Sequence, residues 1–384
     1  MKNITILSVG IGGYGGVLNA ELLRDGHNHG IEIAAAVEPY ADSCPLTSEF
    51  NNRNIPIYKT MEDFYANGGK ADLALIATPI KFHTQNIICA LENGSNVLCE
   101  KPLCGDEKDI DKIIEAREKS GKFVYIGYQW SHSKAIEDLK NDIMSGKFGK
   151  AELLKTLVLW PRDADYFARG TGWAGKIADS DGALIYDSIA NNAAAHYLHN
   201  IFYVLGKELN VAEVPVSYDA KLYRANKIEN FDTAVINCTF EDGAKALYVA
   251  SHCINKNLNP VFDYRFEKGR VLFSQDEPPA EIGDAALYKK DCIKAIMADG
   301  SVKEYGNPFE NACRKVYLAA DTVRGNGKEY CGVETSAVHT RFINDLQKNA
   351  DIKCFDASRI ITDGKMTYVD GLFEELVQAW DGNV

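Results

Sequence analysis

The chain has 384 residues, of which 46% are hydrophobic and 25% are charged, and its formal net charge is -12. This length and composition predict a soluble protein with two globular domains. The acidic balance argues against nucleic acid and anionic membrane surfaces as partners, because both bind through a basic face.

The first predicted element is an apolar strand at residues 4–9, which runs directly into a G-x-G-x-x-G turn and so is not a signal peptide. A helix is predicted to follow at residues 17–24. Gly10 permits a tight turn, Gly12 lets the main chain approach a pyrophosphate, and Gly15 lets the helix pack closely on the strand. The N–H groups that begin the helix would face the phosphates. The turn residues assigned to cofactor binding are Gly10, Gly12, Gly13, Tyr14 and Gly15.

A second predicted strand at residues 31–37 ends at Glu38, close to where a dinucleotide-binding unit places its acidic residue. Its carboxylate would accept hydrogen bonds from an adenosine ribose and repel a 2′-phosphate, so NAD is favoured over NADP. The alternative is a Rossmann-like unit that has lost its ligand, since glycine loops are common between strands and helices.

Strands and helices continue to alternate to about residue 128, which predicts a parallel sheet covered on both faces. We therefore assign residues 1–130 to a Rossmann dinucleotide-binding domain. The further strands are predicted at 73–77, 96–100 and 123–127, and the further helices at 61–66, 83–94 and 107–119.

Residues 131–384 are predicted to form an α+β substrate-binding and oligomerisation domain with a large, open, mostly antiparallel sheet. Between residues 214 and 306, strands are joined by acid–glycine and lysine–glycine turns, which are typical of hairpins. The predicted helices are at 134–144, 190–205, 310–323, 335–348 and 372–380, with one further strand at 151–159.

The ten cysteines include no C-x-x-C pair, which favours reduced thiols in a cytoplasmic protein and argues against a structural zinc site. No apolar run approaches the roughly 18 residues of a membrane-spanning helix. We therefore expect neither a bound metal nor a membrane span.

Lys101 follows the predicted strand at 96–100, at the carboxyl edge of the sheet, where open α/β sheets bind their ligands. Pro102 restricts the backbone of Lys101 to an extended conformation. Beside a positive nicotinamide ring, the pKa of the amine would fall from about 10.4 towards neutrality, which suits proton exchange with a substrate hydroxyl. Taken alone, Lys101 is equally well explained as a surface lysine at a strand end.

These motifs together resemble the Gfo/Idh/MocA oxidoreductases, a family that includes glucose–fructose oxidoreductase and inositol dehydrogenase. The resemblance implies that Lys101 touches the reacting hydroxyl of the substrate, that NAD is the cofactor and that the protein is a homodimer or homotetramer. It rests on the glycine turn, Glu38, Thr78-Pro79 with His83, Glu100-Lys101-Pro102, Gly127-Tyr128-Gln129 and the turn from Gly146 to Gly149. The residues that it places at the cofactor are Thr78, Pro79, His83, Glu100, Lys101 and Gln129.

The second catalytic position departs from the family pattern, in which an aspartate is followed four residues later by a histidine. Asp187 fits the aspartate, but Asn191 occupies the position of the histidine. His196 lies ten residues before Gly206, the distance that the family shows. A local insertion would make His196 catalytic and Asn192 its partner, with Asp187 still able to reach the site.

His196 and His199 are three residues apart and so share one helix face. Metal binding is disfavoured because no further ligand lies nearby in sequence. A pair of core histidines is a second explanation. We favour His196 as an acid/base that contacts substrate, with His199 as its neighbour or as a second contact.

Residues 160–173 mix aromatic rings with arginines, a composition that suits a sugar, and Arg162 and Arg169 would tolerate a carboxylate. For any single residue, a loop that packs its rings on the sheet is an equally good explanation. The candidate substrate contacts are Tyr128, Trp130, Arg162, Tyr166, Trp173, Asn192 and His199.

The sequence thus predicts an NAD-dependent oxidoreductase acting on a secondary hydroxyl of a sugar, polyol or sugar derivative. Lys101 would take the hydroxyl proton with help from His196. One alternative is redox-neutral glycoside cleavage, in which NAD is recycled within the site. Another is a non-catalytic regulator that binds NAD and sugar, although an intact Lys101 and His196 argue against it.

Overall fold

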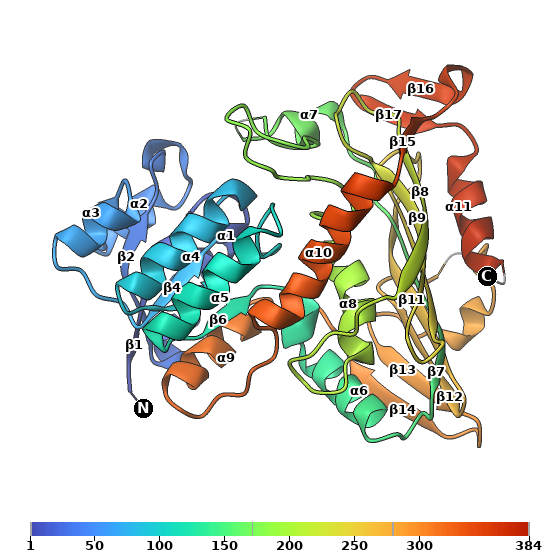
Figure 1. Cartoon of the computed structure of the whole chain (residues 1–384), viewed down its shortest axis with the longest axis horizontal. Coiled ribbons are helices and arrows are strands. Elements are labelled where there is room, and N and C mark those ends of the chain that lie inside the picture. Colours follow the sequence, from blue (N-terminus) through green and yellow to red (C-terminus); the bar gives the residue numbers. More distant parts are fainter. Residues whose placement is uncertain (1, 171, 279, 383–384) are drawn as a thin grey trace. The chain divides into compact units, whose positions relative to one another are not determined.

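The computed structural model describes residues 2–170, 172–278 and 280–382 (Figure 1). Two compact units are present: the first comprises Met1–His132 and Asn311–Ala337, and the second Ser133–Glu310 and Val338–Val384. The sequence predicted a single boundary near residue 130. It missed the return of residues 311–337 to the first unit.

The first unit contains a six-stranded parallel sheet in the order β3-β2-β1-β4-β5-β6. The strand order reverses between β1 and β4, so the loops that follow these two strands diverge, as at the ligand sites of doubly wound sheets. The strands are β1 (Ile4–Val9), β2 (Ile31–Val37), β3 (Ile57–Tyr58), β4 (Leu73–Ile76), β5 (Asn96–Cys99) and β6 (Val124–Ile126).

Helices α1 (Gly13–Asp25) and α9 (Arg314–Val323) share one hydrophobic cluster with this sheet. Val316, Ala319 and Ala320 of α9 are fully buried in the cluster, which explains why this distant segment belongs to the first unit. The other helices are α2 (Thr47–Asn52), α3 (Met61–Ala66), α4 (His83–Glu92) and α5 (Asp109–Ser120), with short 3-10 turns η1 (Gly26–His29), η2 (Ala41–Ser43), η3 (Ile80–Phe82) and η4 (Gln129–His132).

The second unit is built on a nine-stranded sheet in the order β14-β13-β12-β11-β7-β10-β9-β8-β15. Over the described residues the β7–β10 and β8–β15 strand pairs are parallel and the other strand pairs are antiparallel, which confirms the prediction of a large, mostly antiparallel sheet. Its strands are β7 (Ala151–Leu159), β8 (Ser217–Arg224), β9 (Thr233–Thr239), β10 (Lys245–Ser251), β11 (Leu258–Phe266), β12 (Gly269–Ser274), β13 (Ile293–Met297), β14 (Val302–Gly306) and β15 (Ile352–Cys354).

Helices α8 (Ala195–Leu205) and α11 (Leu372–Asp381) lie on opposite faces of this sheet (Figure 1). Trp380 of α11 is buried in the cluster on its face. The remaining elements are α6 (Lys134–Met144), α7 (Ala164–Ala168), α10 (Val333–Asn349), η5 (Ala285–Leu287), η6 (Ala357–Arg359) and the hairpin of β16 (Ile360–Asp363) and β17 (Met366–Val369). No helix within the described ranges combines the length and hydrophobicity needed to span a bilayer.

The helix predicted to start near residue 190 begins only at Ala195, and turns precede it. The side chain of Asn191 donates hydrogen bonds to the carbonyls of Ile185 (3.3 Å) and Tyr186 (3.1 Å). Asparagine favours turns over helix because its amide can bond to nearby main-chain groups in this way.

Candidate functional site

The glycine turn after β1 excludes side chains at two of its positions. Gly10 has φ +87°, and a Cβ there would lie 2.7 Å from the Ala77 carbonyl oxygen. A Cβ on Gly15 would lie 2.2 Å from the carbonyl oxygen of Gly10. Both positions therefore require glycine for the fold itself, as the sequence predicted.

Gly12 differs, because the protein's own packing does not require a glycine there. Its backbone is extended, and a Cβ would meet only the Cys44 sulfur, at 3.4 Å. The absence of a side chain at Gly12 leaves space in front of the first turn of α1. This space fits the close approach of a pyrophosphate to the main chain.

Substitution of the two glycines is therefore expected to separate folding from binding. We expect Gly15→Ala to lower the free energy of unfolding by about 1–3 kcal/mol, because the new methyl overlaps main-chain atoms. Gly12→Ala should change it by less than about 0.5 kcal/mol, yet weaken NAD binding by about tenfold or more, roughly 1.4 kcal/mol. Denaturant titration and calorimetric NAD titration measure the two effects. Unimpaired NAD binding by Gly12→Ala would contradict the assignment.

Glu38 lies directly after β2, and its carboxylate is held against the glycine turn. One carboxylate oxygen accepts a hydrogen bond from the Ile11 N–H at 3.2 Å, and the other from the Tyr40 N–H at 3.1 Å. The acidic group predicted to bind a ribose is thus positioned beside the turn predicted to bind phosphates.

His83 joins the loops that follow β4 and β5. Its imidazole nitrogens contact the carbonyl oxygens of Pro102 (Nδ1, 2.7 Å) and Thr78 (Nε2, 2.9 Å), and the residue is almost fully buried. Burial lowers the pKa of His83, and the two carbonyls oppose that effect. Pro79, in the first of these loops, is exposed. His83 thus fixes the loop around Lys101, which is half-buried and joined to Pro102 by a cis peptide bond.

Lys315, on α9, was missed by the sequence analysis and is fully buried beneath the predicted cofactor loops. Its amine forms an ion pair with Glu100 and lies 3.4 Å from the Gly127 carbonyl oxygen and 3.5 Å from the Tyr14 hydroxyl. Burial acts to lower the pKa of Lys315, but Glu100 and Tyr14 outweigh it and raise that pKa. One lysine therefore connects the start of α1 with the loops that follow β5 and β6.

The residues after β6 include three that the sequence assigned to ligands. Gln129 is half-buried at the start of η4, whereas Tyr128 and Trp130 are 0% and 1% exposed. Burial raises the pKa of Tyr128 well above its usual value. Neither buried ring presents a surface for stacking on a sugar in this structure, and the substrate role of both stays a prediction.

In the second unit, three predicted substrate residues are brought together around the short helix α7. The guanidinium of Arg162 lies 4.9 Å from the centre of the Tyr166 ring. The guanidinium of Arg169 lies 3.6 Å from the same ring and 4.6 Å from that of Trp173. Arg169 thus completes a cluster of two arginines and two aromatic rings.

Asp187 is buried and its carboxylate is held in place. One oxygen accepts a hydrogen bond from the Gly175 N–H (2.6 Å), and the other accepts one from the Asn192 amide (2.7 Å). Asn192 was predicted to partner His196, and here its amide holds Asp187. His196 itself is half-buried in the first turn of α8.

His199 is fully buried between aromatic rings. Its ring centre lies 6.0 Å from that of Tyr203 and 6.2 Å from that of His339. This environment is typical of a core histidine, and its substrate contact stays a prediction. Over the described part of the chain, no three His, Cys, Asp or Glu side chains are grouped to hold a metal ion.

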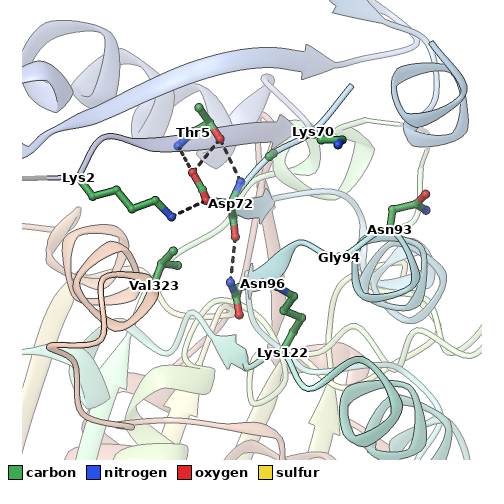
Figure 2. A pocket seen from close by; sticks show the side chains of 10 residues that line it. Lys2, Thr5, Lys70, Asp72, Asn93, Gly94, Asn96, Lys122 and Val323 are labelled. Atoms are coloured by element: carbon green, nitrogen blue, oxygen red, sulfur yellow. Dashed lines mark hydrogen bonds and ion pairs between the residues drawn. The ribbon is translucent and has the colours of Figure 1, made fainter. Parts of the chain in front are cut away.

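A cavity of about 390 Å³ lies at the opposite, amino-terminal edge of the six-stranded sheet, and Figure 2 shows the side chains that line it. Asp72 there accepts hydrogen bonds from the Lys2 amine (3.1 Å) and from the N–H and hydroxyl of Thr5 (3.0 Å each). Because the predicted cofactor loops follow the carboxyl ends of the strands, this cavity is separate from the candidate site.

This chain resembles known proteins both in sequence and in fold. Residues 4–128 match the family model GFO_IDH_MocA, an oxidoreductase family with an NAD-binding Rossmann fold. Inositol 2-dehydrogenase of Corynebacterium glutamicum (strain R) is 30% identical over 153 residues, which are 39% of this chain and 45% of that relative. The chain thus matches less than half the length of this relative and of two further inositol 2-dehydrogenases.

Two solved structures share the fold over 91% of this chain, each with a TM-score of 0.70. One is the WlbA dehydrogenase from Bordetella pertussis in complex with NADH and UDP-GlcNAcA, at 18% identity and 97% coverage of that chain. The other is an oxidoreductase from Agrobacterium radiobacter in complex with NAD+, L-tartaric acid and magnesium, at 15% identity and 96% coverage. The predicted family, fold class and NAD cofactor are confirmed: residues 4–128 match the Gfo/Idh/MocA oxidoreductase family, whose NAD-binding domain has a Rossmann fold.

Proposed function

We propose that this protein transfers hydride between nicotinamide and a secondary hydroxyl of a sugar, polyol or sugar derivative. The observation that carries the proposal is the position of Lys101. This lysine lies at the carboxyl edge of the six-stranded sheet of the Rossmann fold, in a loop that His83 holds through the Pro102 carbonyl. The inositol and WlbA dehydrogenases named above support a polyhydroxylated substrate class.

The glycine turn and Glu38 would hold the cofactor through the pyrophosphate and the adenosine ribose. The loops around Thr78, Pro79 and Glu100, together with Gln129, would line the rest of it. Bound NAD supplies the hydride acceptor, or NADH the donor.

Lys101 would accept the proton of the substrate hydroxyl and return it in the reverse direction. Asp187 and His196 of the second unit are proposed as its assistants, on the family resemblance. The buried Asp187 carboxylate, fixed by a main-chain N–H and by Asn192, has the rigid orientation that such a role needs.

The test is absorbance at 340 nm while protein and NAD are offered sugars, polyols, their acids and aryl glycosides. A rise with one free sugar or polyol supports the dehydrogenase. NAD-dependent release of the aryl group without that rise would favour redox-neutral glycoside cleavage. NAD and sugar binding without either signal would favour a regulator.

The choice of NAD over NADP is proposed to rest on Glu38. Glu38→Gln keeps the size of the side chain and one acceptor oxygen, but it replaces the other oxygen by an NH2 group and removes the charge that repels a 2′-phosphate. We expect the ratio of the NADP and NAD dissociation constants to fall by about tenfold or more, roughly 1.4 kcal/mol. Glu32→Gln, at an exposed position on the preceding strand β2, is the matched control. An unchanged ratio in Glu38→Gln would refute this role.

We also propose a cytoplasmic homodimer or homotetramer. All ten cysteines are free, which suits a reducing compartment. Helix α11 packs through Trp380 on one face of the nine-stranded sheet and covers part of it. A second copy of the chain that binds this face would therefore contact the part that α11 leaves uncovered. Light scattering at several protein concentrations measures the assembly state.

A further inference from the structure

Two arginines of the second unit stack on one tyrosine. The guanidiniums of Arg162 and Arg169 lie 4.9 and 3.6 Å from the Tyr166 ring centre. Trp160 lies 5.4 Å from the first guanidinium and Trp173 lies 4.6 Å from the second. Stacking covers the flat faces of the guanidiniums. The N–H groups at their edges then remain available to donate two parallel hydrogen bonds to an oxyanion.

In the part of the chain that the structure describes, neither arginine has a carboxylate partner. Arg162 donates weakly to the Pro161 carbonyl (3.5 Å) and interacts with the Tyr166 hydroxyl, and its buried Nε has no partner. Arg169 donates to the Tyr166 carbonyl at 2.5 Å. Other arginines of the described ranges do pair with acids, among them Arg24, Arg53, Arg117, Arg265, Arg270, Arg324 and Arg359.

The acids beside this cluster bind other groups: Asp163 accepts the Tyr166 N–H, and Asp165 pairs with Lys365. His252, whose ring centre is 5.5 Å from that of Tyr166, adds no charge because burial lowers its pKa to about 3. Asp187 acts electrostatically on Tyr166 while its two oxygens accept hydrogen bonds from Gly175 and Asn192, so it offsets part of the positive charge without forming an ion pair with either arginine. The two half-buried guanidiniums thus form no ion pair within the described residues, which leaves them able to bind an external anion.

We propose that Arg162 and Arg169 bind the carboxylate of an acidic sugar or polyol substrate. This inference rests on the proposed function and narrows its substrate class. The aromatic rings of Trp160 and Trp173 would contact the apolar face of the sugar, while the two guanidinium edges hold its carboxylate.

The test compares binding of matched acid and neutral compounds to the full chain with NAD by calorimetry. The pairs are D-glucuronate with D-glucose, D-galacturonate with D-galactose, and D-gluconate with D-glucitol. We expect at least one acid to bind about tenfold or more tightly than its neutral partner. Arg162→Gln and Arg169→Gln should each remove that preference, whereas Arg341→Gln, an exposed control in the same unit, should keep it.

Two further measurements keep the outcome decisive. Arg162→Lys retains the positive charge but not the paired N–H donors of the guanidinium. We expect this variant to fold and to lose most of the preference for the acid over its neutral partner. Equal binding within all three pairs, or an acid preference that survives both Gln variants, would overturn the proposal. Inorganic phosphate that binds more tightly than every acid, and depends on both arginines, would overturn it in favour of a phosphorylated substrate.

Failure of this inference can be told apart from failure of the proposed function. Arginine-dependent acid binding without any signal at 340 nm would retain the carboxylate site and remove the dehydrogenase. Turnover of a neutral polyol that is unaffected in both Gln variants, without acid preference, would retain the dehydrogenase and remove the carboxylate site.

Discussion

Lys101→Ala is expected to lower the turnover number by about 10²- to 10⁴-fold, the usual contribution of a positioned general base. NAD should still bind, because the glycine turn and Glu38 are unaffected. The variant should also fold, since Lys101 is only half-buried and its loop is held by His83. Initial rates at 340 nm and calorimetric NAD titration check both parts.

Two companion variants isolate the proton-transfer role. Lys101→Arg keeps the positive charge, but a guanidinium cannot give up its proton near neutral pH, so we expect it to be as inactive as Lys101→Ala. Lys70→Ala removes the same charge at the opposite edge of the sheet and should be fully active. Activity of Lys101→Arg near the wild-type level would show that the lysine acts through its charge alone.

Lys315→Met is expected to lower the free energy of unfolding by about 3–5 kcal/mol, because it leaves the buried Glu100 carboxylate without its counter-charge. NAD affinity should fall as well, since the start of α1 and two predicted cofactor loops lose their common contact. Denaturant titration and calorimetry measure the two losses.

The double variant Glu100→Gln, Lys315→Met should recover much of the stability, because no unpaired charge then remains buried. The pKa of Lys315 is raised in the folded state. Its stabilisation is therefore complete below the unfolded lysine pKa of about 10.4 and lost only as the pH rises through the folded value. We expect the deficit of Lys315→Met to be the same at pH 7 and pH 9. A double variant no more stable than the single one would argue against the ion pair.

Features that depend on neighbouring residues were predictable from the sequence. The glycine turn requires small residues at fixed spacing, and Glu38 and Lys101 follow apolar runs that can only be strands. Their position at one edge of the sheet then follows from the parallel order of the strands. Contacts between distant segments were not predictable, and Lys315 lies 215 residues from Glu100.

A signal for Lys315 was nevertheless present in the sequence. It stands four residues before Ala319, and so on the helix face that α9 buries. A lysine on an apolar face requires an acidic partner. Which acid it meets depends on the tertiary fold, and local periodicity carries no information about that choice.

The return of residues 311–337 to the first unit means that the nucleotide-binding unit is not a contiguous stretch of the gene. The matched family region ends at residue 128, yet the lysine that neutralises Glu100 is encoded almost two hundred codons later. A recombination event that exchanged only the first 132 residues would combine the glycine turn and the Glu100 position of another protein with Lys315 of this chain. Chimaeras with other dehydrogenases should therefore exchange α9 together with the N-terminal segment.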